Sequence, residues 1–128
     1  MKQFLTIMLT LSIFTLSSFA AGLSDYIRAR EFALRFANVI GAQGTTYTLG
    51  RDNEDPRRLT VVAGSRDAYI GGLGGQRVKL DRGAKVDARG LLIPASALKY
   101  LGCTVRDAGK DILATCDGKS YSLQRFAR

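Results

Sequence analysis

The sequence predicts an α+β fold: two halves, each a helix followed by antiparallel strands, that together form a twisted sheet packed on the helices. Three observations predict it. Two segments have the apolar spacing of short helices and end at a glycine. Short runs rich in β-branched and aromatic residues, separated by turn residues, follow each of these segments. The order of these features recurs along the 128 residues, a length that suits one domain with one core.

The first segment has the features of a secretory signal peptide, which we place at residues 1–20. Lys2 supplies a positive start, Phe4–Leu16 is an apolar run, and Ser18 and Ala20 are the small residues that precede a cleavage site. The alternative is a retained membrane anchor, but the run is short for a span and no other stretch of about 18 apolar residues follows. We therefore expect residues 21–128 to be extracytoplasmic (periplasmic, on the cell surface or secreted) and peripheral to the membrane.

The first half is expected to span residues 21–70. A helix is expected over Tyr26–Ile40, with Ser24 as its N-cap and Gly41 as its C-cap, because several of its apolar residues sit at helical spacing. Three strands should follow, with the charged segment Arg51–Arg58 as an exposed loop after the first of them. These strands are expected at Thr45–Leu49, Leu59–Ala63 and Asp67–Ile70.

The second half is expected to span residues 76–128. Its helix should cover Ala95–Leu101, with Pro94 in the first turn and Gly102 as the cap. Gly71–Gly75 should be a flexible joint between the halves and not a phosphate-binding loop, because a strand and not a helix follows it. The strands of this half are expected at Gln76–Leu80, Lys85–Asp87, Leu91–Ile93, Thr104–Asp107, Asp111–Cys116 and Lys119–Gln124, with a hairpin turn at Asp117-Gly118.

The two halves can be aligned as an internal repeat. Placing Gly41 on Gly102 matches the two predicted helix caps. Leu59–Arg66 then falls on Ile112–Lys119, once the charged loop of the first half is allowed for. Each half is therefore predicted to be a helix, a glycine cap, a strand and a hairpin.

Cys103 and Cys116 are the two cysteines of the chain. An even number in an exported protein indicates a disulfide, and this one would close a short loop worth roughly 3 kcal/mol. In the alignment of the halves the two cysteines fall on Ala42 and Ala63, small residues that could meet where the bridge lies. The alternative is a reactive or metal-binding pair.

Five short segments of the second half follow the pattern of a known family. They are Gln76–Leu80, Gly90–Pro94, Ala97–Val105, Asp117–Lys119 and Tyr121–Leu123. Together they resemble a copper amine oxidase N-terminal-like domain, best over Gln76 to Leu123. The resemblance implies that residues 21–128 form a single domain of this kind, with residues 21–70 as a degenerate first half.

The same resemblance carries expectations about structure and function. It implies a twisted sheet wrapped on a helix, used as a stalk or attachment module on bacterial envelope proteins, and this module does not hold the oxidase's copper. Two features depart from the family pattern. Ala95-Ser96 stands where the family often has Leu-Arg, and the cysteine pair is not a general feature of the family.

The composition excludes several kinds of catalytic site. The chain has no His and no Trp, and both of its Met residues, Met1 and Met8, would leave with the leader. His is the usual general base near neutral pH and the commonest metal ligand. The residues that a Ser-His-Asp triad, a zinc hydrolase site or a typical copper site requires are therefore missing. We expect no enzymatic activity, no cofactor and no metal site.

The charge points to an anionic partner. Lys and Arg number 19 against 11 Asp and Glu, a net charge of +8, and Arg holds phosphate or carboxylate in a bidentate fork. We assign anion or partner binding to five arginines: Arg28, Arg30, Arg51, Arg57 and Arg58. The alternative is a charge that serves only solubility. Asp52, Glu54 and Asp55 could instead suggest calcium, but arginines crowd that loop.

The function we expect is that of an exported, non-catalytic module of the cell envelope, within a surface assembly, that engages an anionic polymer or an envelope protein. No nucleic-acid-binding motif accompanies the charge, so no specific nucleic acid is expected. One alternative is a copper-linked redox accessory protein, which would have to use the cysteines, Tyr or carboxylates as ligands. The other is an inhibitor of an exported enzyme that inserts the loop Arg51–Arg58 into its target.

Overall fold

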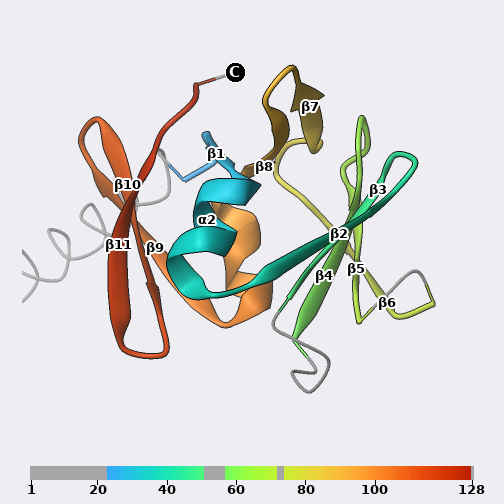
Figure 1. The fold of residues 1–128 in the computed structure, drawn as a ribbon, viewed down its shortest axis with the longest axis horizontal. Coiled ribbons are helices and arrows are strands. Elements are labelled where there is room, and N and C mark those ends of the chain that lie inside the picture. The colour runs from blue at the N-terminus through green and yellow to red at the C-terminus, as the bar shows by residue number, and fades with distance from the viewer. Residues whose placement is uncertain (1–22, 51–56, 72–73, 128) are drawn as a thin grey trace, which may run out of the picture.

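The structure is a computed structural model that describes residues 23–50, 57–71 and 74–127, and it consists mostly of β-strands (Figure 1). The strands form three antiparallel sheets. The largest contains, in spatial order, β2 (Val39–Gln43), β3 (Thr46–Gly50), β4 (Arg58–Val62), β5 (Asp67–Ile70) and β6 (Gln76–Lys79). A three-stranded sheet contains β1 (Tyr26–Arg28), β8 (Gly90–Pro94) and β7 (Lys85–Asp87), and another contains β11 (Lys119–Gln124), β10 (Asp111–Cys116) and β9 (Cys103–Ala108).

The prediction of an α+β fold, with one twisted sheet packed on helices, is wrong. The described residues contain two short helices, α2 (Ala29–Phe36) and the 3-10 helix η1 (Ala95–Leu101). In Figure 1 both helices lie in the middle of the molecule, with the five-stranded sheet on one side and the β9–β11 sheet on the other. The helices fill the space between separate sheets and do not form a layer of their own.

The first helix is shorter than predicted because the residues at both ends of the predicted segment belong to strands, β1 before the helix and β2 after it. Tyr26–Arg28 pairs with β8 as β1, so the helix begins at Ala29 and Ser24 is not its N-cap. The helix ends at Phe36, Ala37 caps it in a left-handed conformation with a φ of 55°, and β2 then begins at Val39. β-branched and aromatic residues fit a pleated strand, and here the hydrogen bonds to a neighbouring strand decide between the two conformations.

The elements of the second half lie close to their predicted positions. The helix at Ala95–Leu101 is present as a 3-10 helix and ends at Gly102, whose φ is 80°. Pro94 is extended and lies before the helix, at the end of β8, and not in its first turn. Asp117 and Gly118 both have positive φ values, 50° and 80°, as a type I′ hairpin turn requires.

One order of elements occurs twice in the chain. A strand, a helix, a left-handed residue and a three-stranded meander make up β1–α2–β2–β3–β4 and again β8–η1–β9–β10–β11. The residue two positions after the left-handed one pairs in an equivalent way in both: Val39 with Gly50, and Thr104 with Thr115. Each helix also packs against the third strand of the other copy, α2 against β11 and η1 against β4.

This correspondence replaces the predicted alignment of the halves. The residue that matches Gly102 is Ala37, whereas Gly41 lies inside β2. Counting on from these positions, Cys103 matches Asn38 and not Ala42. The argument that small residues mark the bridge position therefore fails.

The glycine-rich segment Gly71–Gly75 joins β5 to β6, which pair antiparallel next to each other. It is therefore the connection of one hairpin and not a joint between two halves. β6 itself belongs to the sheet of β2–β5.

One hydrophobic core joins all three sheets and both helices. Its largest members are fully buried and come from every part of the fold: Phe32, Ile27, Leu49, Leu59, Leu80, Ile93, Leu98, Ile112 and Leu123. Neither helix in the described part of the chain is long and apolar enough to cross a membrane.

Candidate functional site

Arg28 is held by contacts within the protein. Its Nη1 and Nη2 donate to Oδ1 and Oδ2 of Asp87 at 2.9 and 3.0 Å, a bidentate pair, and its guanidinium lies 4.9 Å from the centroid of the Phe126 ring. The hydrogen bonds raise the pKa of Arg28 and lower that of Asp87. Its side chain is 15% exposed. Arg28 therefore ties β1 to the β7–β8 hairpin and does not offer a free fork to a ligand.

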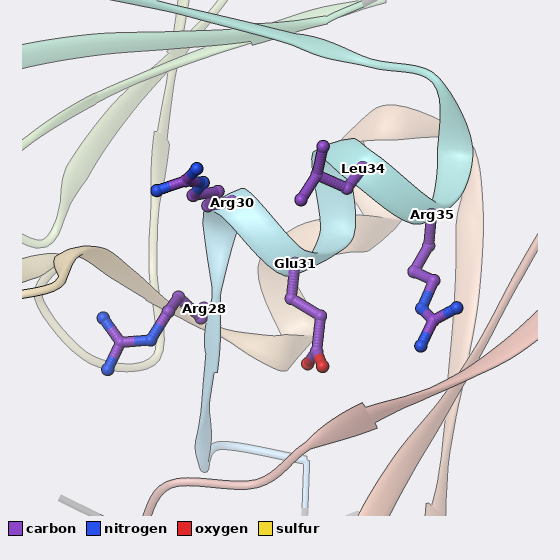
Figure 2. A pocket seen from close by; sticks show the side chains of 5 residues that line it. All are labelled: Arg28, Arg30, Glu31, Leu34 and Arg35. Carbon is purple, nitrogen blue, oxygen red and sulfur yellow. The ribbon is translucent and has the colours of Figure 1, made fainter.

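The outer face of α2 carries two exposed basic residues, Arg30 and Arg35. The helix buries Phe32 and Phe36 toward the core and turns Arg30, Leu34 and Arg35 to the solvent. Leu34 is 75% exposed, the most of any large apolar residue described. An open hollow of about 470 Å³ lies on this face, lined by Arg28, Arg30, Glu31, Leu34 and Arg35 (Figure 2).

Glu31 is the acidic residue of this face, and its carboxylate is engaged elsewhere. Its Oε1 accepts a hydrogen bond from the backbone N–H of Gln124 at 2.8 Å, which ties the helix to β11. Figure 2 shows the Glu31 side chain directed away from Arg30 and Leu34. Because the described residues give neither Arg30 nor Arg35 a carboxylate partner, the hollow presents two guanidinium groups to solvent.

Arg35 links this hollow to a second one. Its guanidinium lies 5.8 Å from the centroid of the Tyr121 ring, which meets Phe36 edge-on at 5.1 Å. The second hollow, of about 330 Å³, is lined by Arg35, Phe36, Ala37, Cys116, Asp117 and Lys119. The two hollows share Arg35, and we call Arg30, Leu34, Arg35 and Lys119, which line them from the start of α2 to the β10–β11 turn, the α2 strip.

The remaining predicted arginines lie outside the α2 strip. Arg51 is outside the described residues, as are Asp52, Glu54 and Asp55. Arg57 pairs with Asp117, with 3.6 Å between Nη2 and Oδ2, and its side chain crosses Gly102. Arg58 lies in β4, where its side chain passes over Gly50.

The structure therefore brings together two of the five predicted arginines, Arg28 and Arg30, at one hollow. Sequence reasoning assigned no binding role to Leu34 or Lys119. Arg35 has a sequence signal, because it is a basic residue in the last turn of α2. Lys119 has none, because only the packing of α2 on β11 brings it near the helix.

The predicted disulfide between Cys103 and Cys116 is confirmed. The two residues face each other at the ends of β9 and β10, and their Cα atoms are 4.4 Å apart. This is the spacing of a non-hydrogen-bonded antiparallel pair, at which opposite side chains approach most closely. Both cysteines are buried, and neither offers a thiol to a metal.

The described residues contain no group of three His, Cys, Asp or Glu side chains that could hold a metal ion. No family model, no curated protein and no solved structure matches this chain.

Proposed function

We propose that the chain is an exported, non-catalytic module of the cell envelope that binds an anionic polymer through the α2 strip. The observation that carries the proposal is the open hollow on α2. Of its four charged residues, Arg28 and Glu31 are engaged by Asp87 and by the β11 backbone. The other two, Arg30 and Arg35, direct their charge outward.

A polymer with repeated negative charges suits this strip. Guanidinium groups bind carboxylate or phosphate through charge-assisted hydrogen bonds. Leu34 lies between the two arginines and offers apolar contact, and Lys119 extends the strip toward the β10–β11 turn. The net charge of +8 would draw such a polymer from a distance.

The buried disulfide suits the proposed location. Disulfides persist in oxidising compartments, so Cys103–Cys116 favours an extracytoplasmic protein. The proposed signal peptide, residues 1–20, lies outside the described residues. We also propose that residues 21–128 are a copper amine oxidase N-terminal-like domain, and the recurring order of strand, helix, left-handed residue and meander supports this.

No observation on the described residues favours the two alternatives, a copper-linked redox accessory protein and an inhibitor of an exported enzyme. Of the ligands that copper would have to use, the cysteines, Tyr and carboxylates, the disulfide occupies both cysteines. The inhibitory loop would consist mostly of residues that lie outside the described part of the chain, and Arg57 at its end pairs with Asp117.

A charge-matched comparison tests the binding proposal. Poly-L-glutamate is titrated into the protein at low salt, with neutral dextran as a negative control. The variant Arg30→Gln/Arg35→Gln should lose affinity about tenfold or more, because two charge-assisted contacts are removed. The control Arg77→Gln/Arg106→Gln removes the same charge from exposed positions on β6 and β9 and should change affinity about twofold or less. Equal losses in both variants would show that binding depends on net charge, and the α2 strip would not be the site.

A further inference from the structure

β2 is an exposed edge strand that has neither the charged residues nor the proline that often prevent an edge from pairing with another chain. It is the first strand of the five-stranded sheet, and among the described strands it pairs with β3 alone. Its residues Val39, Gly41, Ala42 and Gln43 are exposed, and in Figure 1 it passes in front of β4 and β5. An edge strand of this kind presents a row of main-chain donors and acceptors to any chain that can pair with it.

The other free edges carry charged side chains. β6 has Arg77 and Lys79, β7 has Lys85 and Asp87, β9 has Arg106 and Asp107, β1 has Arg28, and β11 has Lys119 at its start. Charges on an edge discourage a second strand from pairing with it. β2 has the sequence VIGAQ and carries none, so it stands apart from the other edges of the described sheets.

The alternation of main-chain hydrogen bonds along β3 shows which N–H and C=O groups of β2 point outward. The amide of Ala63 donates to the carbonyl of Thr45 at 2.9 Å, so Thr45 bonds toward β4. Bonding alternates along a strand, so Thr46 and Thr48 bond toward β2, to Gln43 and Gly41. Ile40 and Ala42 then direct their N–H and C=O groups to the open edge.

We infer that the β2 edge pairs with the β2 edge of a second copy of this chain, antiparallel about a two-fold axis through Gly41. In this register Ile40 lies opposite Ala42 of the other copy, and both present outward groups, so each such pair exchanges two main-chain hydrogen bonds. Gly41 lies opposite Gly41 of the other copy at the closest approach, where the absence of side chains removes any clash. Val39 lies opposite Gln43 of the other copy.

Charge supports a neutral seam of this kind. Like charges directly opposite each other in a sheet are destabilising, and β2 carries no charged residue, so two copies of a protein of net charge +8 can join there without opposing any. The remaining repulsion between the two copies is long-range and is screened by salt. Self-association should therefore tighten as salt rises, whereas polyanion binding by the α2 strip should weaken, and the two proposals can fail separately.

Sedimentation equilibrium of the protein at low and high salt tests the inference, and the dimer should have twice the chain mass. Gly41→Lys and Gly41→Glu each place two like charges at the axis and should both give monomers, although they shift the net charge in opposite directions. An added side chain at Gly41 meets nothing within 4 Å in the monomer, so the fold should tolerate these changes. The control Gly41→Thr should remain dimeric, because opposite threonines pair well.

A second variant and a second measurement keep the test decisive. Ala42→Pro removes an outward N–H that β3 does not use and should abolish the dimer, whereas Ala42→Thr should keep it. Hydrogen exchange should show the amides of Ile40 and Ala42 gaining protection on dimerisation, whereas Gly41, which bonds to β3, should not change.

Three results would overturn the inference. One is a protein that stays monomeric up to about 1 mM at high salt. Another is a dimer that survives both Gly41→Lys and Ala42→Pro. The third is a monomer whose Ile40 and Ala42 amides gain protection only when a foreign extended peptide is added, which would assign the edge to a different partner.

Discussion

Ile27 of β1 lies directly opposite Ile93 of β8, and both side chains are fully buried. Each isoleucine sits in the strand that opens one of the two matching orders of elements, immediately before a helix. Their contact therefore joins the two copies at the centre of the molecule, between segments far apart in the sequence. A core built around such a contact depends on both halves being folded.

Ile27→Ala should lower the free energy of unfolding by about 2–5 kcal/mol, because it removes buried methyl groups and leaves a cavity in a packed core. Urea unfolding followed by circular dichroism measures this loss. Leu34→Ala on the exposed face of α2 is the control and should change stability by about 0.5 kcal/mol or less. Similar losses in the two variants would contradict the placement of Ile27 in the core.

Ala37 and Gly102 occupy equivalent left-handed positions, with φ values of 55° and 80°. The left-handed conformation costs a non-glycine residue roughly 1–2 kcal/mol. Replacing that residue by glycine removes this cost, but it also increases the entropy of the unfolded chain, which offsets part of the stabilisation. We expect Ala37→Gly to stabilise the protein by about 0.5–1 kcal/mol. Gly102→Ala should destabilise it by more, because the Arg57 side chain also occupies the space of the new methyl group. Thermal melts of both variants measure the effect, and shifts of the same sign would refute the equivalence.

Removing the disulfide should lower the free energy of unfolding by roughly 3 kcal/mol, the chain-entropy value for a short loop. Unfolding with and without reductant, and of the variant Cys103→Ala/Cys116→Ala, measures the loss. Reductant should have no effect on that variant, because the chain has no further cysteine. A reductant effect of equal size on the variant would mean that the loss does not come from the bridge.

The Arg28–Asp87 pair predicts a pH dependence of stability. Hydrogen bonds from Arg28 and from the backbone N–H of Arg89 lower the pKa of Asp87 in the folded protein. The stability contributed by a carboxylate with a lowered pKa is complete above its unfolded pKa, about 3.9, and is lost as the pH falls toward the folded value. The protein should therefore lose stability below about pH 4.

Asp87→Asn should be less stable than the parent at neutral pH and should lose less stability on acidification, since the titrating carboxylate is gone. Unfolding midpoints between neutral and acidic pH measure both effects. Asp81→Asn, at an exposed position without an ion pair to any described residue, serves as the control and should follow the parent. Parallel curves for the parent and Asp87→Asn would show that the pair contributes nothing to acid stability.

Much of the second half could be predicted from local signals. The turn Asp117-Gly118 and the cap Gly102 carry their own sequence signatures, and the structure confirms them together with the strand predicted at Asp111–Cys116. The first half could not be predicted in the same way. Tyr26–Arg28 is too short to show a strand period beside a helix, and only its pairing with β8 makes it a strand.

The residues of the candidate site could likewise be predicted only in part from the sequence. The sequence showed an excess of arginine and assigned a role to Arg28, Arg30 and others alike. It could not show that Asp87 engages Arg28, because that residue lies on a distant hairpin. Nor could it show that Lys119 lies near Arg35.

The sequence by itself determined the short turns, the cysteine pairing, the surplus of positive charge and the lack of histidine, because these depend on residue type and local spacing. Tertiary structure decided the mostly β architecture, the division into three sheets, the arginines that remain available and the strand edge that remains open. The physical reason is that pairing between distant strands supplies main-chain hydrogen bonds and burial that override local helix propensity. Which side chains and edges those pairings leave exposed is set only by the finished fold.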